Sequence, residues 1–283
     1  MNLEWINKES KENVVVWVHG FLSSGTTCWQ SEKSYWPKIV SDDFKSHEFS
    51  NIVFTYQTDV FSSNYSLGDV VDSLKELIGL KGILKYKNII FVCHSMGGII
   101  ARKYLLERAV DLINNNNKIG LFLIASPSLG SNYADFFNPI AKLFKHSQAE
   151  SLRFVDNNPW LAELSKNFRN LKEEKNLQIS GKELVEDKFI VFHKLFFFKQ
   201  IVPPLSGAQY FGNPIKIPKS DHFTIAKPNS KEDFQNQLLI KFLQDFLSES
   251  KKEINANPSN DNSGDTFTNI ENSTITNRSN NKR

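Results

Sequence analysis

The most informative stretch of this chain is FVCHSMGG, residues 91–98. An apolar, β-branched run precedes its serine, and apolar residues at helical spacing follow over 96–107. A strand that turns directly into a helix leaves space only for small residues two positions either side of the turn's apex. Gly97 meets this demand, and Cys93 stands where the common G-x-S-x-G pattern has its first glycine. The stretch predicts a nucleophile elbow with Ser95 at its apex; the alternative is an ordinary turn serine.

An earlier motif supplies a second element of the same chemistry. The apolar run at 13–18 ends in His19, Gly20 and Phe21. Acyl transfer needs two backbone N–H donors for the oxyanion, one from the residue after the nucleophile and one from a loop after an earlier strand. We therefore expect the amides of Phe21 and Met96 to form an oxyanion hole. In the alternative interpretation, His19 is a core histidine in a plain turn.

Strand-like runs and helical patterns alternate along the chain. The runs lie near 13–18, 51–57, 88–93 and 119–125, and the helical patterns lie near 29–40, 67–83 and 96–114. This alternation predicts a mostly parallel sheet with right-handed crossovers and helices on both faces. Residues 132–175 follow, and we expect them to form a small helical cap over the site.

A serine nucleophile also needs a histidine base, and in elbow-type sites this histidine follows the serine along the chain. His146 lies in a polar stretch, and His193 lies inside an apolar strand-like run, where a structural role fits better. His222 follows a strand-like run and precedes a final amphipathic helix. A loop at that point can return an imidazole to the serine, so we expect His222 to be the base.

The choice of the orienting carboxylate is narrowed by a gap. No Asp or Glu lies between Asp187 and Asp221. Asp221 would have to fold back on its own backbone to reach the imidazole of the next residue. The remaining candidates are Glu183, Glu186 and Asp187, with Asp135 further away in the sequence.

Glu183 has the position expected of the acid. Residues 176–180 are strand-like, and Gly181 and Lys182 follow them as a turn. An acid after the penultimate strand of such a sheet belongs at this point. We therefore expect Glu183 to orient the imidazole of His222; the alternative is a solvated surface glutamate.

Together these motifs resemble those of the α/β-hydrolase superfamily. Within it, the chain is most similar to the serine-active-site-containing protein group, a lipase-like branch related to the glycosylphosphatidylinositol inositol-deacylase family. The likeness extends over residues 13 to 247. It rests on Val18-His19-Gly20-Phe21, His94-Ser95-Met96-Gly97-Gly98, Ala125-Ser126-Pro127 with Gly130-Ser131, Ser180 to Leu184, Ile201-Val202-Pro203, and Asp221-His222-Phe223-Thr224-Ile225-Ala226-Lys227-Pro228.

The resemblance implies an α/β-hydrolase fold and a serine hydrolase or acyl transferase that acts on lipid or other acyl esters. It implies a triad of Ser95, His222 and Glu183, with Glu183 on the family's carboxylate-bearing turn. Two residues depart from the family pattern. Cys93 replaces the elbow's first glycine, and Leu205 stands where relatives often carry an acid.

Composition fits one enzyme domain. The chain has 283 residues, 40% of them hydrophobic, enough for one sizeable core in a domain over residues 1–249. A net charge of +3, with no basic cluster among aromatics, argues against nucleic acid as a partner. We expect no metal and no cofactor.

The cellular compartment is predicted from the cysteine content and from the lengths of the apolar runs. Two cysteines, Cys28 and Cys93, make no disulfide framework and fit a reducing environment. The first residues lack the apolar region of a signal peptide, and no run reaches about 18 apolar residues. We expect a cytoplasmic protein.

Two apolar segments have two interpretations each. Residues 136–144 carry Phe, Ile and Leu at helical spacing, and residues 195–198 read Leu-Phe-Phe-Phe between two lysines. Packing against the body is the first interpretation, and for 195–198 it means a core strand. The other is an acyl pocket or peripheral contact with a membrane surface.

The tail at 250–283 is rich in Asn, Ser and Thr, so we expect disorder. Residues 266–277 are an exception, because they are β-prone and nearly uncharged, as cross-β segments are. They weakly resemble the amyloid signalling motifs through which some bacterial hydrolase-type effectors meet a sensor protein. The alternative is a plain polar tail.

Two classes of function are consistent with these features. The first is a serine esterase or lipase that forms an acyl-enzyme on Ser95. The second is an interaction module that keeps the fold and has lost its chemistry, an idea motivated by Cys93 and the uncertain acid. An effector esterase recruited through its tail combines both.

Overall fold

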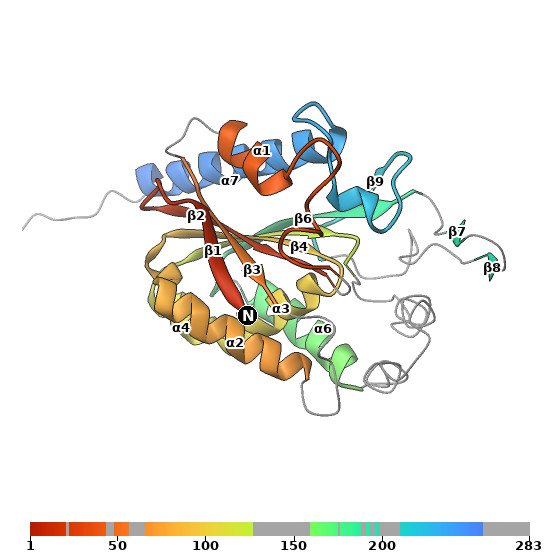
Figure 1. Cartoon of the computed structure of the whole chain (residues 1–283). Coiled ribbons are helices and arrows are strands. Elements are labelled where there is room, and N and C mark those ends of the chain that lie inside the picture. Colours follow the sequence, from red (N-terminus) through yellow and green to blue (C-terminus); the bar gives the residue numbers. More distant parts are fainter. Residues whose placement is uncertain are drawn as a thin grey trace, which may run out of the picture.

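A mostly parallel sheet forms the centre of the protein in the computed structural model (Figure 1). The structure describes residues 1–20, 23–43, 48–56, 66–126, 159–174, 176–187, 191–192, 196–197 and 210–256. Within these ranges, the sheet has seven strands in the order β1-β3-β2-β4-β5-β6-β9. Their bounds are β1 Asn2–Asn7, β2 Asn13–Val18, β3 Ser50–Thr55, β4 Asn88–His94, β5 Lys118–Ile124, β6 Ile179–Glu186 and β9 Ile215–Ile217.

Strand direction sets where the site can lie. β1 runs antiparallel to β3, and every other neighbouring pair in this sheet is parallel. β4 and β5 are buried at every residue, as expected for central strands with helices on both faces. The carboxyl ends of the parallel strands therefore meet at one edge of the sheet.

Helices cover both faces of the sheet (Figure 1). One face carries α1 (Trp36–Asp43) and α7 (Phe234–Ala256). The other carries α2 (Leu67–Lys81), α3 (Gly97–Glu107), α4 (Ala109–Asn114) and α6 (Pro159–Glu173). Short 3-10 helices lie at η1 (Ile83–Lys85) and η3 (Thr224–Ala226). The sheet separates two hydrophobic cores, one under each helical layer.

The described architecture confirms the predicted α/β sandwich and corrects several boundaries. The helical pattern at 96–114 is two helices, because the chain breaks at Arg108 between α3 and α4. α7 extends to Ala256, beyond the predicted end of the domain at 249. β6 begins at Ile179 and continues through the predicted turn at Gly181.

The predicted cap and tail fall mostly outside the described residues. Residues 127–158 and 257–283 are not described, so the cap over 132–158 and the motif at 266–277 stay predictions. α6 is described, and its Leu164 and Phe168 are buried in the core with α3. This end of the predicted cap therefore packs against the body.

The apolar run near 195–198 is only partly described. Val191–Phe192 (β7) and Phe196–Phe197 (β8) pair with each other as an antiparallel two-stranded ladder. This ladder is separate from the seven-stranded sheet. Phe196 and Phe197 are therefore in a strand, and the core-strand expectation for 195–198 stays a prediction.

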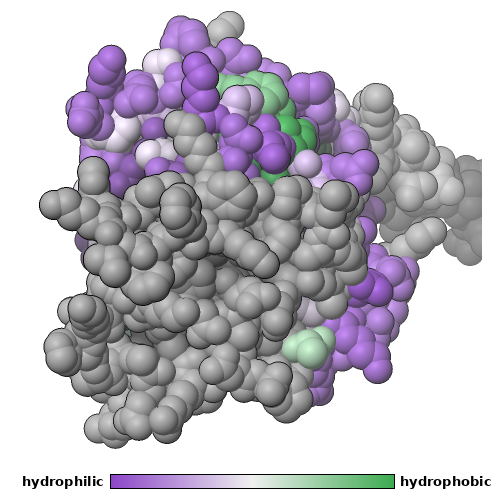
Figure 2. Space-filling model, turned by 90° about the vertical axis from the view of Figure 1, so that its right-hand side faces the viewer, coloured by the Kyte–Doolittle hydropathy of each residue, from purple (hydrophilic) through white to green (hydrophobic). Residues whose placement is uncertain are grey.

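Figure 2 shows the side toward which the carboxyl end of β6 points. The described side chains visible on this side are mostly hydrophilic, with a hydrophobic area near the top of the view and a paler one lower on the right (Figure 2). Among the described helices, none combines the length and the apolar character that crossing a bilayer requires.

Candidate active site

Ser95 lies at the apex of a tight turn between β4 and α3. Its φ of 54° is in the left-handed region, which residues other than glycine rarely adopt. Its N–H donates to the carbonyl oxygen of Ile124 at 2.9 Å, which ties the apex to β5. Backbone strain of this kind persists only when the surrounding structure holds it in place. The turn has the geometry of the predicted nucleophile elbow.

Two glycines let neighbouring backbone segments reach the elbow. A Cβ added at Gly97 would collide with the carbonyl oxygens of Val18 and His19 at the end of β2. A Cβ added at Gly20 would lie 2.7 Å from the Cβ of Ser95. The start of α3 and the turn after β2 therefore pack directly on each other, and both positions need glycine because a side chain has no space.

Cys93 fits the position of the elbow's usual first glycine. It is fully buried and lies in register with Val18 on β2 and Leu123 on β5. Burial raises the pKa of its thiol far above the ordinary value, so the side chain stays a neutral thiol. The cysteine is therefore a small core residue, and the turn forms with it in place.

His222 lies beside Ser95. The distance between its Nε2 and the Oγ of Ser95 is 3.1 Å, and both residues are buried. His222 follows β9 and directly precedes the turn of η3. His146 and His193, the other histidines after the serine, lie outside the described residues. The structure thus brings together the serine and the histidine that the sequence pairs.

Glu186 lies on the other side of His222. Its Oε1 is 3.6 Å from the Nδ1 of His222, and both side chains are almost completely buried. This separation exceeds a hydrogen bond, but such contacts are often long in ligand-free sites and shorten when substrate binds. Ser95, His222 and Glu186 form a continuous row.

Glu183, the acid predicted from the sequence, does not meet His222 in the structure. Its Oε1 accepts hydrogen bonds from the N–H groups of Tyr210 at 2.7 Å and Phe211 at 3.3 Å. Successive side chains of a strand point to opposite faces. Glu183 and Glu186 are an odd number of residues apart in β6, so only one can face His222. Glu186 is the residue whose side chain faces His222, and it also ends β6 at the carboxyl edge of the sheet.

The other acidic candidates have other partners or lie outside the described residues. Asp187 accepts from the N–H of Lys219 at 3.2 Å and lies 3.6 Å from the Nζ of Lys216. Asp221 accepts from the N–H groups of Phe223 and Thr224 at the start of η3. Asp135 is not described.

Of the two residues predicted to form the oxyanion hole, the structure describes Met96. Met96 takes the N-cap position of α3, directly after the elbow serine, and is buried. Its amide is at the amino end of the helix, where the dipole favours a developing negative charge. Phe21 lies outside the described residues.

His19, in the motif after β2, is completely buried. Its Nε2 accepts from the N–H of Tyr56 at 3.1 Å, and its Nδ1 lies 2.8 Å from the carbonyl oxygen of Gly20. Its ring stacks on the Tyr56 ring at 4.1 Å. Burial lowers the pKa of His19 to about 4, so the ring is neutral at neutral pH.

This low pKa predicts a loss of stability in mild acid. The unfolded histidine titrates near 6.5 and the folded one near 4, so the unfolded state binds more protons between these values. The contribution of the neutral His19 ring to the free energy of unfolding is therefore fully present above pH 6.5. It is lost as the pH falls toward 4, and this loss is ~3 kcal/mol. Urea unfolding followed by tryptophan fluorescence at pH 7 and pH 5 measures this loss. Equal free energies of unfolding at the two pH values would contradict it.

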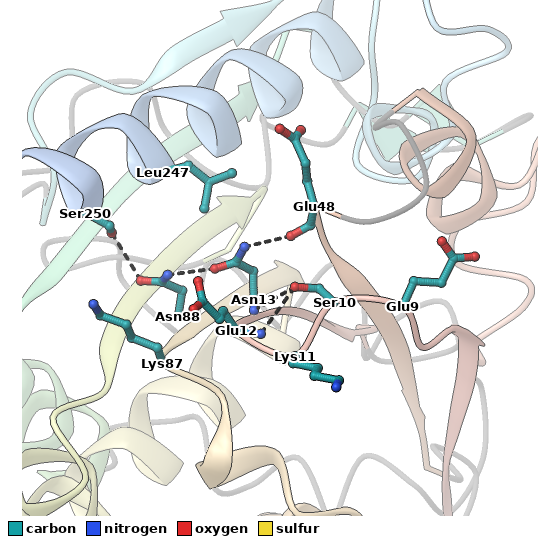
Figure 3. A pocket seen from close by; sticks show the side chains of 10 residues that line it. All are labelled: Glu9, Ser10, Lys11, Glu12, Asn13, Glu48, Lys87, Asn88, Leu247 and Ser250. Atoms are coloured by element: carbon teal, nitrogen blue, oxygen red, sulfur yellow. Dashed lines mark hydrogen bonds between the residues drawn. The ribbon is translucent and has the colours of Figure 1, made fainter. Parts of the chain in front are cut away.

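A hollow with a volume of about 340 Å³ lies at the edge of the sheet opposite the carboxyl ends of its parallel strands (Figure 3). Its polar side chains bond one another: Ser250 donates to Asn88, Asn88 to Asn13, and Asn13 to the carbonyl oxygen of Glu48. The chain of bonds joins α7 to the amino ends of β4 and β2. This hollow is therefore a polar seam of the fold, remote from Ser95.

Within the part of the chain that the structure describes, no cluster of three or more His, Cys, Asp or Glu side chains could hold a metal ion.

The part of the chain that contains the elbow matches a known protein family. Residues 8–153 match the family model described as "Putative serine esterase (DUF676)", which is more than half of the 283 residues. The chain belongs to this family. The family segment includes β2, the elbow and β5, and it ends before Glu186 and His222. Membership confirms the likeness to lipase-like serine esterases that the motifs indicate.

Curated relatives of this family member match over a similar length. The chain is 29% identical over 165 residues to Protein SERAC1 of Danio rerio and 26% identical over 163 residues to Protein SERAC1 of Homo sapiens. Each match covers 56% of this chain and 24% of the relative. The chain thus corresponds to about a quarter of the length of these relatives.

Solved structures share the fold of this family member. The mature lipase BlEst2 of Bacillus licheniformis superposes with a TM-score of 0.52 at 15% identity, over 82% of this chain and 92% of the lipase. At this identity the likeness concerns the fold. It confirms the predicted α/β-hydrolase fold.

Proposed function

We propose that the protein is a serine esterase that cleaves an acyl ester through a covalent acyl-enzyme. Ser95 is the nucleophile, His222 the general base and acid, and Glu186 the orienting carboxylate. The observation that carries the proposal is the 3.1 Å contact between the Oγ of Ser95 and the Nε2 of His222 in a strained elbow.

In each half of the reaction the proton moves between Ser95 and His222. His222 accepts the Ser95 hydroxyl proton at Nε2 as the serine oxygen attacks the ester carbonyl carbon. The resulting imidazolium returns the proton to the alcohol oxygen when the C–O bond of the ester breaks. Water then attacks the acyl-enzyme in the same way, and the carboxylic acid and free Ser95 are released.

Glu186 holds the imidazole ready for this transfer. For Nε2 to accept, the proton of the neutral ring must be on Nδ1, which faces the Glu186 carboxylate at 3.6 Å. A buried carboxylate at this place favours that tautomer and stabilises the imidazolium that forms. The charge on Glu186 is thus needed in the transition state.

The oxyanion of the tetrahedral intermediate requires amide donors. We assign the amides of Met96 and Phe21 to it, as the motif order in the sequence indicates. Met96 begins a helix and follows the nucleophile directly, which supports its assignment. Phe21 follows Gly20, which packs against Ser95.

For the substrate, we propose a lipid ester. The support is the likeness of the motifs to lipase-like hydrolases and the fold shared with a bacterial lipase. Peripheral membrane contact, a cytoplasmic location and a signalling partner at residues 266–277 belong to the same proposal.

The rival function, an inactive interaction module, loses its main motivation. It rested on Cys93 and on the uncertain acid. Cys93 is accommodated in the core without disturbing the turn, and Glu186 stands against the imidazole. The esterase is therefore the function that the geometry supports best.

Turnover of p-nitrophenyl esters tests the proposal. We expect the full chain to hydrolyse esters of two to sixteen carbons with a preference for longer acyl chains, and Ser95→Ala to leave only the background rate. No turnover of any ester by well-folded protein would contradict the esterase. Equal rates at all chain lengths would contradict the lipid preference and leave the esterase intact.

A further inference from the structure

The imidazole of His94 contacts the loop that carries the proposed base. His94 ends β4, directly before Ser95, and its side chain is buried. Its Nε2 lies 2.8 Å from the backbone carbonyl oxygen of His222. The two imidazole rings are 5.0 Å apart. The strand that carries the nucleophile is thus bonded to the backbone of the base itself.

The tautomer of His94 follows from its partners. A carbonyl oxygen only accepts, so the Nε2 of His94 must carry the proton. Burial lowers the pKa of His94 well below its usual range, so the ring is neutral and its Nδ1 is an acceptor. Cys28 lies next to this atom, with its Sγ 3.4 Å from Nδ1. The Cys28 thiol, which burial keeps protonated by raising its pKa to about 11, therefore donates to His94.

The ring of His94 is confined from further sides. A Cβ added at Gly20 would lie 2.8 Å from its Nδ1, so the absence of a side chain at Gly20 leaves the space that the ring fills. Trp29 meets the ring edge to face at 6.3 Å. The ring therefore has little freedom to leave the His222 carbonyl.

Other hydrogen bonds of the His222 loop lead to the end of β6 or stay within the loop. The N–H of Lys219 donates to the Asp187 carboxylate, and the N–H of Asp187 donates to the carbonyl oxygen of Ser220. The Asp221 side chain accepts from the N–H of Phe223, and the hydroxyl of Ser220 donates to the carbonyl oxygen of Ile217. These bonds shape the turn without joining it to β4. Among the described contacts, the hydrogen bond from the His94 imidazole to the His222 carbonyl oxygen joins this backbone to β4 and so fixes it relative to Ser95.

We propose that His94 is a positioning residue that holds the His222 imidazole over Ser95, with Cys28 setting the tautomer in which His94 can donate. The inference rests on the proposed esterase function. His94 touches no reacting atom; it acts through the placement of His222. Its loss therefore lowers the rate of the chemical step and leaves substrate binding unchanged.

Two amide variants separate placement from bulk. In His94→Gln, the side-chain N–H₂ reaches the position of Nε2 and can still donate to the His222 carbonyl. In His94→Asn, the shorter amide reaches only the position of Nδ1, so the donor is lost. Both side chains are neutral and polar, which makes them a matched pair.

The test measures the rate at which a fluorophosphonate acylates Ser95, together with kcat and KM for a p-nitrophenyl ester. We expect His94→Asn to lower the acylation rate and kcat by about 10- to 100-fold with unchanged KM, and His94→Gln to restore both to within about threefold of wild type. Cys28→Ser, which keeps a donor, should exceed Cys28→Ala in rate. Thermal unfolding of each variant shows whether it is folded.

The outcomes distinguish this inference from the proposed function. If wild type is not labelled at Ser95, the esterase proposal fails. If wild type is labelled and folded His94→Asn reacts at the same rate as wild type or as His94→Gln, the esterase stands and the positioning role is wrong. A change in KM alone would also overturn it.

Discussion

Replacing His222 by alanine is expected to lower kcat by about 10⁴- to 10⁶-fold. The variant removes the atom that lies 3.1 Å from the Ser95 Oγ and takes its proton. The backbone carbonyl of residue 222 remains, so the bond from His94 can keep the turn in place. Single-turnover and steady-state hydrolysis of a p-nitrophenyl ester measure the loss.

The double variant supplies the control for this prediction. Residues that act as one unit show strongly non-additive losses. Ser95→Ala combined with His222→Ala should therefore be no slower than Ser95→Ala alone. Losses that multiply would mean that the two side chains act independently, and would contradict their assignment to one proton transfer.

Glu186→Gln is expected to lower kcat by about 10³- to 10⁴-fold. The amide has almost the same shape as the carboxylate but carries no charge, so it can present an N–H to the Nδ1 of His222 and favour the wrong tautomer. It also cannot stabilise the imidazolium. The pH dependence of kcat and the rate of Ser95 labelling report both effects.

Glu183→Gln is the matched control. The new side chain keeps an oxygen that can accept from the N–H groups of Tyr210 and Phe211, so kcat should stay within about threefold of wild type. The same chemical change in the same strand thus separates the two faces of β6. A larger loss from Glu183→Gln than from Glu186→Gln would restore Glu183 as the acid and contradict the assignment made from the structure.

The elbow could be predicted from the sequence because its requirements are local. Ser95 needs a strand before it, a helix after it and a residue without a side chain at Gly97, and each leaves a pattern in consecutive residues. The pairing of Ser95 with His222 could also be predicted from the sequence. It follows from chain order and from the few histidines after the serine.

The contact between Glu186 and His222 could not be predicted from the sequence, because the extent of β6 is not a local property. The sequence predicts a turn at Gly181, yet Gly181 lies within β6. A Cβ there would meet the ring of Phe211 and the carbonyl oxygen of Leu121, so the glycine serves close packing inside the sheet. Once the strand runs on to Glu186, the alternation of side chains assigns that glutamate to the face of His222. The sequence feature that could have indicated the longer strand is Gly181, since a glycine inside a strand often marks close packing.

The role inferred for His94 could not be predicted from the sequence at all. Its partners, Cys28 and the backbone of His222, come from segments distant in the chain, and no spacing between them has a characteristic pattern. Only the fold brings them together at the elbow.

The most direct measurement is the site of covalent modification by a fluorophosphonate. The full chain is treated with the probe, digested and mapped by mass spectrometry. We predict one adduct, on Ser95, that is absent in Ser95→Ala and forms far more slowly in His222→Ala, while His222→Ala remains folded. An adduct on another residue, or labelling of Ser95 at the same rate without His222, would contradict a nucleophile activated by that histidine.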